Sequence, residues 1–257
     1  MTLPGASPGA APVPRAAPRP DLRRRVRRAP ATFTLILVTT LIFALQEASL
    51  AFLGLDYPAG LGAKVNAAIL DGQAWRLITP VFLHAGLWHL FINMYSLYAL
   101  GPAVEHLLGW RRMLAVYLLS GVVGVELSFA LSPAASLGAS GAIFGLLGAV
   151  GAFLFLHRTT LGRSAEIHLR QIVFVALINL GLGLMPGIDN WAHLGGLAGG
   201  VALAFLAGPR FLVTFSADGQ IQLYDQRPWN LVRTRIIFAV AAVLALAAVA
   251  ALFRLNT

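Results

Sequence analysis

Long apolar runs separated by short polar segments set the pattern of this chain. The runs lie at about 31–55, 87–104, 113–131, 140–156, 172–185, 191–207 and 232–252. About 20 apolar residues in a row are enough to cross the hydrocarbon core of a bilayer as a helix. The fifth and sixth runs are short and interrupted by glycine. The pattern predicts an all-α polytopic membrane protein with seven transmembrane helices.

Composition supports this class. Hydrophobic residues make up 58% of the chain and charged residues 11%, with a mean hydropathy of +0.77. Soluble domains carry roughly 25% charged residues. The chain has no cysteine, so disulfides, a thiolate nucleophile and a cysteine-based metal site are excluded.

Residues 1–30 differ from the rest of the chain. They are rich in alanine, proline and arginine and contain almost nothing large to bury, so we expect a disordered tail. The run after Arg28 is long enough to span, and no short apolar segment with a cleavage site precedes it. We therefore do not expect a cleaved signal peptide.

The positive charge is arranged in a way that indicates membrane topology. A net charge of +9 would suggest a nucleic-acid partner in a soluble chain, but seven arginines lie between Arg15 and Arg28, ahead of the first run. This indicates a cytoplasmic tail rather than nucleic-acid binding. We expect the C-terminus to lie outside and the second, fourth and sixth spans to enter from outside. Arginines recur in alternate connections, as Arg111, Arg112, Arg158, Arg163, Arg170, Arg210, Arg227, Arg233 and Arg235, while the other connections hold only Lys64 and Arg76.

Two small motifs stand at the outer ends of the fourth and sixth runs. Ser140 lies in Gly-Ala-Ser-Gly-Ala, and His193 lies in Trp-Ala-His-Leu-Gly-Gly. If both helices enter from the same side, the two side chains can meet, and a hydroxyl that contacts an imidazole is a potential nucleophile with its base. The alternative is that glycine, alanine and serine only allow close helix packing in the membrane.

Glycine pairs follow each of these motifs. Gly141 and Gly145 form one pair with four-residue spacing, and Gly196 and Gly200 form another. Such pairs let helix backbones approach closely. Because glycine lowers helix propensity, two pairs at matched depth predict that close contact is required there.

The second span adds two polar side chains. His89 and Asn93 are four residues apart and share a helix face near the outer end. They can donate hydrogen bonds to an oxyanion that forms when Ser140 attacks a carbonyl. The alternative is that they serve as polar contacts between helices.

The order of these motifs resembles the rhomboid family of intramembrane serine proteases, over about residues 70–208. The resemblance implies a six-helix core at 31–208 with a water-filled cavity that opens outward, preceded by the tail at 1–30. A connector and a seventh transmembrane helix follow at 209–257. The residues that carry the resemblance are Trp75, Arg76, His84, His89, Asn93, Glu105, Gly109, Arg112, the Gly138 to Gly141 motif and the Ala192 to Gly196 motif.

The resemblance also implies roles for the site residues. Ser140 would be the nucleophile, and His193 the base and then the acid, without a third acidic residue. The backbone N–H of Ser140 would form the oxyanion hole with His89 and Asn93, and Gly138 would give room for the backbone there. The family uses no metal or cofactor. Substrates of the family are single-span transmembrane proteins in the lipid bilayer, which are cut near their outer ends. We expect this protein to lie in the bacterial plasma membrane.

Other residues are expected to support this site. The resemblance gives structural parts to His84, Glu105 and Arg112, and it makes 184–190 a cap over the site. Phe144 falls where some relatives have a tyrosine that stacks on the catalytic histidine. Trp75, Arg76 and Trp88 suit the headgroup level of the membrane, and Glu126, inside the third span, is expected to be paired within the bundle.

Two other functions stay open at this point. A non-catalytic rhomboid-like binder or chaperone would typically lack the serine or the histidine that this chain retains. A histidine-metal membrane enzyme is suggested by the spacing of His84 and His89. Such di-iron sites need more histidines than the six present, of which His106, His157 and His168 fall on the predicted cytoplasmic side.

Overall fold

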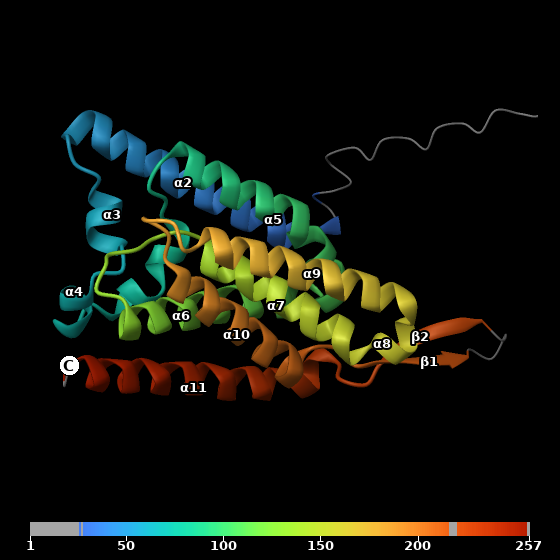
Figure 1. Ribbon diagram of the computed structural model, residues 1–257. Helices are drawn as coiled ribbons and strands as arrows, with labels where there is room; N and C mark the ends of the chain where they lie inside the picture. Colours follow the sequence, from blue (N-terminus) through green and yellow to red (C-terminus); the bar gives the residue numbers. More distant parts are fainter. Residues whose placement is uncertain (1–25, 27, 216–219, 256–257) are drawn as a thin grey trace, which may run out of the picture.

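Figure 1 shows the computed structural model of the chain, which describes residues 26, 28–215 and 220–255. The described residues form seven long helices, which run roughly along one direction and form a bundle (Figure 1). The beginning of α2 and the end of α11 lie at opposite ends of that bundle. The disorder predicted for the tail falls almost entirely outside the described residues. The helices are α2 (Pro30–Leu53), α5 (Leu87–Leu108), α6 (Trp110–Leu131), α7 (Ser140–Leu156), α9 (Arg163–Leu182), α10 (Asn190–Ala207) and α11 (Trp229–Leu255).

These seven helices occupy the seven predicted positions, which confirms the all-α membrane fold. Within the described part of the chain, five of them are long and apolar enough to cross a membrane: α2, α6, α9, α10 and α11. The α7 helix is apolar but has only 17 residues, and α5 carries His89 and Asn93 in its first half. The α9 helix starts at Arg163, although the predicted apolar run starts at 172. Its first turns are polar, so the apolar pattern marked only the later part of the helix.

The connection between α2 and α5 is built from short elements. These are α3 (Tyr57–Gly62), α4 (Asn66–Leu70) and two 3₁₀ turns, η1 (Ala74–Leu77) and η2 (Thr79–Phe82). Arg76 lies inside this connection, only 5% exposed. It donates to the carbonyl oxygens of Ala63 at 2.7 Å and Gly60 at 2.8 Å. Arg76 therefore holds the end of α3 through these carbonyls, and its expected place at headgroup level stays a prediction.

The two tryptophans expected at headgroup level behave differently from Arg76. Trp75 is 51% exposed and Trp88 is 77% exposed. The Trp75 ring nitrogen donates to the Leu61 carbonyl at 2.9 Å. Both indole rings are thus exposed at the protein surface, as tryptophan side chains at a membrane interface are.

A β-hairpin that the sequence did not predict fills the connector before α11. Strands β1 (Phe211–Phe215) and β2 (Ile221–Asp225) pair antiparallel, with Phe211 opposite Asp225. The short helix α8 (Arg158–Leu161) lies near the hairpin (Figure 1). Arg112 at the start of α6 forms an ion pair with Asp225 at 3.0 Å and also donates to the Arg227 carbonyl. These contacts fasten the hairpin to the end of the bundle.

The centre of the bundle is the contact of α10 with α6 and α7. A Cβ atom added to Gly196 would overlap the carbonyl oxygen of Gly141, and one added to Gly200 would overlap that of Gly145. A Cβ on Gly145 would overlap the Ser120 side chain on α6. The two glycine pairs therefore face each other, and the backbones of α7 and α10 touch.

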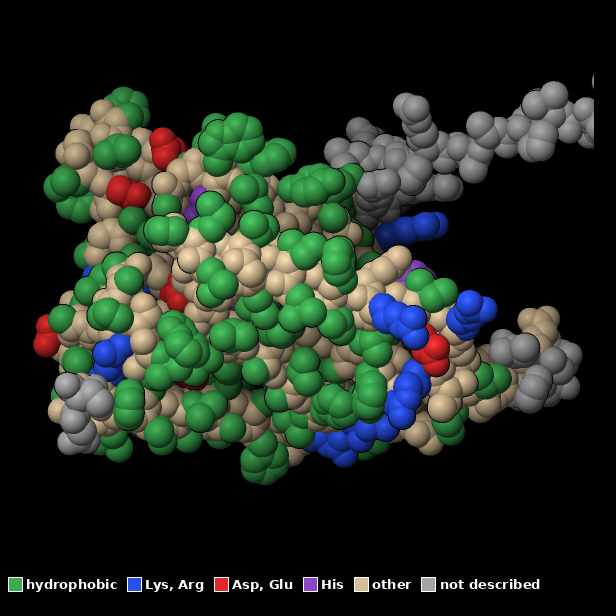
Figure 2. Space-filling model, in the orientation of Figure 1, with side chains coloured by type: hydrophobic (Ala, Val, Ile, Leu, Met, Phe, Trp, Pro, Cys, Tyr) green, Lys and Arg blue, Asp and Glu red, His purple; other side chains and the backbone are tan. Residues whose placement is uncertain are grey.

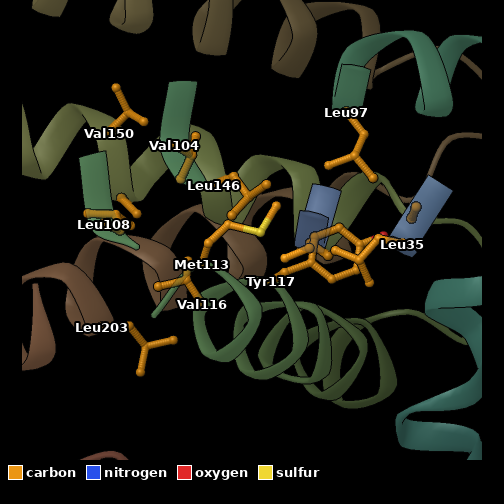
Figure 3. Close-up of a cluster of buried hydrophobic side chains, with 14 of the residues drawn as sticks. Leu35, Leu97, Val104, Leu108, Met113, Val116, Tyr117, Leu146, Val150 and Leu203 are labelled. Atoms are coloured by element: carbon orange, nitrogen blue, oxygen red, sulfur yellow. The ribbon is translucent and has the colours of Figure 1, made fainter. Parts of the chain in front are cut away.

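Apolar side chains from all seven long helices pack in one cluster around this centre, part of which is drawn in Figure 3. They include Leu35 from α2, Leu97 from α5, Tyr117 from α6, Leu146 from α7 and Leu203 from α10. Leu97, Tyr117 and Leu146 are fully buried. A close-packed interior of this kind leaves little room for the helices to shift relative to one another.

Glu105, near the end of α5, holds the start of α2. Its carboxylate accepts hydrogen bonds from the backbone N–H of Ala31 at 2.9 Å and of Thr32 at 2.8 Å, and from the Thr32 hydroxyl at 2.8 Å. The first N–H groups of a helix have no partner within the helix. A carboxylate there also complements the positive end of the helix dipole.

Glu126 departs from expectation. It is only 4% exposed, and both of its carboxylate oxygens are buried without a hydrogen-bond partner among the described residues. The expectation that Glu126 is paired within the bundle is therefore wrong. The described neighbours of this face of α6 offer no donor within reach.

The outer surface matches a chain surrounded by lipid. Figure 2 shows apolar side chains over the middle of the face drawn, and Lys and Arg side chains gathered at the end where α8 and the hairpin lie. Large apolar side chains are exposed along α9 and α11, such as Phe174, Leu177, Phe238 and Leu244, each more than 60% exposed. Such a surface would be costly in water and favourable in hydrocarbon.

Candidate active site

Ser140 and His193 are brought together by the close contact of α7 and α10. Ser140 is the first residue of α7, and His193 lies in the first turn of α10. The Ser140 Oγ and the His193 Nε2 are 2.9 Å apart, which is hydrogen-bond distance. The pair lies at the end of the bundle opposite the hairpin.

Phe144 fixes the plane of the imidazole. It lies one turn after Ser140 on α7, and its ring stacks on His193 with centroids 4.4 Å apart and an interplanar angle of 15°. His193 is 8% exposed. The ring therefore has little freedom to turn its Nε2 away from the Ser140 hydroxyl.

The other imidazole nitrogen has no acidic partner among the described residues. The His193 Nδ1 is buried without a hydrogen bond there. Asp189 is close in sequence, but its carboxylate accepts from the Ala192 backbone N–H at 3.1 Å and from the Ser128 hydroxyl. Asp189 thus caps the start of α10 and ties it to α6 rather than binding the imidazole.

The His89 Nε2 lies against the backbone of Gly138, two residues before Ser140. The Ala85 N–H donates to the His89 Nδ1 at 3.3 Å, so in a neutral ring the proton is on Nε2. A Cβ added to Gly138 would lie 2.8 Å from that Nε2. Gly138 has φ of +139°, which only glycine adopts readily, and its N–H donates to the Pro80 carbonyl at 2.8 Å. Any other residue at 138 would displace His89.

Asn93 lies on the same face but points back along its own helix. It is 4% exposed, and its Nδ2 donates to the His89 carbonyl at 2.9 Å. One of its two amide hydrogens is used in this bond, and the other stays available. The structure thus brings His89 against the Ser140 segment more directly than Asn93.

His84 and Gln46 hold the segment that precedes α5. The Gln46 amide accepts from the His84 N–H at 3.0 Å and donates to the His84 carbonyl at 3.1 Å. The His84 ring contacts the His89 ring edge to face, with centroids 5.0 Å apart. Burial, and then the nearby His89, lower the pKa of His84 to about 4, so it is neutral at neutral pH. Sequence reasoning missed Gln46, although a polar side chain within an apolar run was a signal.

Lys64 holds the loop that carries Gly138. Its ammonium donates to the carbonyls of Ser132 and Ala134, both at 2.8 Å, and its backbone pairs with that of Ser136. Burial lowers the pKa of Lys64 to about 8, so it stays mostly protonated at neutral pH. Sequence reasoning counted Lys64 only as a loop charge, because its acceptors lie far away in the chain.

A small recess adjoins the Ser140 side chain. It has a volume of about 20 Å³ and is lined by Pro80, Gly138, Ser140, Asp189 and Ala192, among others. This volume holds about one water molecule. The expected water-filled cavity is thus a narrow recess in this structure. A larger hollow of about 260 Å³ between α2 and the η1–η2 segment is apolar and contains neither Ser140 nor His193.

Two further predicted site residues lie far from Ser140. Glu105 and Arg112 are at the opposite end of the bundle, where they hold α2 and the hairpin. Among the described residues, no group of three or more His, Asp or Glu side chains is placed to hold a metal ion. His84 and His89 contact each other, but no third ligand joins them there.

Comparison with known proteins identifies one family. The Rhomboid domain matches residues 71–210, which includes Ser140, His193, His89 and Asn93. The chain is 39% identical over 178 residues to the protein named rhomboid protease GluP of Bacillus subtilis (strain 168), and this match covers 69% of the chain and 34% of GluP.

Two other relatives support the same family. The putative rhomboid protease YdcA of Bacillus subtilis (strain 168) is 39% identical over 145 residues, which cover 55% of this chain and 71% of YdcA. RHOMBOID-like protein 7 of Arabidopsis thaliana is 44% identical over 135 residues, which cover 52% of this chain and 43% of that protein. The chain thus spans between about a third and three quarters of the length of these relatives. By its domain match and these identities, the chain belongs to the rhomboid family.

Proposed function

We propose that this chain is an intramembrane serine endopeptidase, which hydrolyses a peptide bond in or near the transmembrane segment of membrane protein substrates. The observation that carries the proposal is the 2.9 Å distance between the Ser140 Oγ and the His193 Nε2. Family membership and the relatives named as proteases support it. A non-catalytic binder would not need this hydroxyl and this imidazole at hydrogen-bond distance.

The proposed reaction uses both residues twice. His193 accepts the Ser140 hydroxyl proton at Nε2 while Oγ attacks the carbonyl carbon, and the protonated imidazole then gives that proton to the leaving amine. The product is an acyl ester on Ser140. Water then attacks the ester, His193 takes a proton from that water, and the proton returns to Ser140 as the acid product leaves.

The negative charge on the substrate oxygen needs donors in place before the reaction. Three candidates support this part of the proposal. The backbone N–H of Ser140 belongs to the first turn of α7 and has no intrahelical partner. The His89 Nε2–H faces the same segment, as the contact with Gly138 indicates. The free amide hydrogen of Asn93 is the third.

The proposed orientation puts this site at the extracytoplasmic face. Arginines gather at the hairpin end of the bundle (Figure 2), and the basic side of a membrane protein faces the cytoplasm. Ser140 and His193 lie at the other end. A substrate would therefore be cut close to the outer end of its own transmembrane helix.

A cleavage assay tests the proposal. The full chain is reconstituted in vesicles with a panel of tagged single-span proteins, and new termini are mapped by mass spectrometry. We expect cuts near one end of the span by the wild type, none by Ser140→Ala, and no effect of EDTA. Binding without any cut across the panel would favour the binder, and loss of activity in EDTA would favour a metal enzyme.

Substitutions at His89 and Asn93 test the oxyanion hole. Removing one side-chain donor from such a site typically lowers turnover by about 10² to 10³. We expect His89→Ala to suffer the larger loss, because it also removes the contacts with His84 and Gly138. Asn93→Ala should be impaired but measurable, with the loss in kcat rather than in KM. Wild-type turnover in the double variant would remove both residues from the mechanism.

A further inference from the structure

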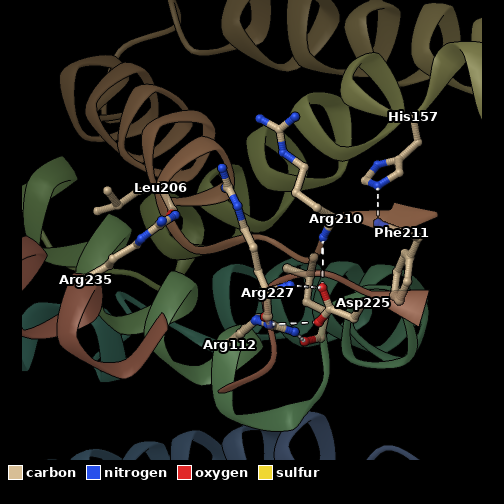
Figure 4. Close-up of polar contacts among 9 residues, drawn as sticks. Arg112, His157, Leu206, Arg210, Phe211, Asp225, Arg227 and Arg235 are labelled. Carbon is tan, nitrogen blue, oxygen red and sulfur yellow. Dashed lines mark hydrogen bonds and ion pairs between the residues drawn. The ribbon is translucent and has the colours of Figure 1, made fainter. Parts of the chain in front are cut away.

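Three arginines meet at the end of the bundle opposite Ser140. Arg210 precedes β1, Arg227 precedes α11 and Arg235 lies in the second turn of α11. Figure 4 shows their guanidinium groups turned toward the same region beside the end of α10. Asp225 is the acidic group drawn with them, and it already pairs with Arg112 at 3.0 Å. Positive charge at this place therefore exceeds the negative charge that balances it.

Two of the three arginines have acceptors in the protein. Arg227 donates to the Phe205 carbonyl at 3.0 Å, and Arg235 donates to the Leu206 carbonyl at 3.1 Å. Both acceptors lie in the last turn of α10, whose carbonyls have no intrahelical partner. A guanidinium carries five N–H donors, so each of these side chains retains donors after capping the helix.

Arg210 has no such acceptor within the described part of the chain. Its Nε is buried without a hydrogen-bond partner there. Burial, and then the nearby charges of Arg210 and Arg235, lower the pKa of Arg227, while Asp225 acts in the opposite direction. A buried donor without a partner and a cluster of like charges both favour a bound anion.

The surroundings indicate what kind of anion fits. The Arg111 guanidinium lies between the rings of Trp110 and Trp229, 5.0 and 5.8 Å from their centroids. Tryptophan at helix ends is typical of the headgroup level of a bilayer. Directly beside the arginines, Phe205 and Leu231 are exposed, at 41% and 60%. The site thus combines a cationic end at headgroup depth with an apolar flank.

We propose that Arg210, Arg227 and Arg235 bind the phosphate of an anionic phospholipid, whose acyl chains lie along the exposed apolar side chains of α10 and α11. Basic pockets between transmembrane helices bind anionic headgroups by the same charge complementarity. The phosphate would accept from Arg210 and from the donors that Arg227 and Arg235 retain. A bound lipid would also shield these three charges from one another.

Arg210→Gln and Arg233→Gln form the test and its matched control. Each removes one positive charge, and neither side chain makes a hydrogen bond or an ion pair with the described residues, so both variants should fold. Arg233 lies two residues before Arg235, and residues two apart on a helix point in nearly opposite directions, about 160° apart. Binding of spin-labelled phosphatidylglycerol and phosphatidylcholine to the purified full chain in detergent is measured by quenching of tryptophan fluorescence.

We expect the wild type to prefer phosphatidylglycerol over phosphatidylcholine. Arg210→Gln should weaken phosphatidylglycerol binding by about fivefold, which corresponds to about 1 kcal/mol per arginine near the membrane surface. Arg233→Gln should change it by less than about twofold, as expected for a charge screened by salt. Equal losses in both variants, or no preference between the two lipids, would overturn the proposal. Displacement of the lipid by millimolar inorganic phosphate would instead assign the site to a soluble anion.

Discussion

Replacing Ser140 by alanine, or His193 by alanine, is expected to lower turnover by about 10⁴-fold or more, and replacing both should lower it no further. A serine hydroxyl attacks an amide poorly unless an imidazole removes its proton, so the two groups act as one unit. The 2.9 Å contact between Oγ and Nε2 is the structural basis of this expectation. Turnover of a reconstituted single-span substrate, measured for both single variants and for the double variant, checks it. Losses that multiply in the double variant would mean that the two residues act independently.

Asp189→Ala is the control for this experiment. Its carboxylate caps α10 and contacts Ser128 rather than the imidazole. Loss of a helix cap typically costs about 1 kcal/mol, so we expect a lower melting temperature. Turnover below that temperature should stay within about an order of magnitude of wild type, far from the loss expected for a missing base. A loss as large as that of His193→Ala would instead assign Asp189 to a catalytic triad.

Gly196→Ala is expected to impair both stability and catalysis. The added methyl group would overlap the Gly141 carbonyl oxygen, so α10 must move away from α7 and take His193 with it. A shift of about 1 Å in a catalytic group can cost about 10²-fold in rate, and overpacking typically costs about 1–3 kcal/mol of stability. We expect a lower rate, measured as turnover, and a lower stability, measured by thermal unfolding in the same detergent.

Gly181→Ala provides the matched substitution. It lies in the last turns of α9, and no atom is within 4 Å of the Cβ that would be added. Alanine also favours a helix more than glycine does. Wild-type stability and turnover are expected for this variant. If Gly196→Ala behaved in the same way, the close contact of α7 and α10 would not be needed for activity.

The sequence predicted the helices well because a membrane imposes a simple rule. Each span needs a continuous apolar run, and the run at 140–156 corresponds to α7, which is Ser140–Leu156. The glycine pairs also predicted which faces meet, since small residues permit backbone contact. Placing Ser140 and His193 at the start of neighbouring parallel helices then follows from the alternation of the spans.

Several parts of the structure could not be predicted in this way. The β-hairpin, the burial of Arg76 and the link between Gln46 and His84 all depend on which backbone groups lack a partner in three dimensions. A carbonyl left free at the end of α3 attracts an arginine, but the sequence does not show that it is free. Glu126 illustrates the reverse case: buried polar groups usually have a hydrogen-bond partner, but its carboxyl has none among the described residues.

Covalent labelling of Ser140 in intact membranes tests the central claim most directly. A hydrophobic fluorophosphonate reacts with a serine only when a neighbouring base activates the hydroxyl. Peptide mapping should find one adduct, on Ser140, in the wild type and in Gly181→Ala, and none in folded His193→Ala. An adduct on Ser140 that forms equally fast without His193, or no adduct on Ser140 in an active preparation, would contradict the account.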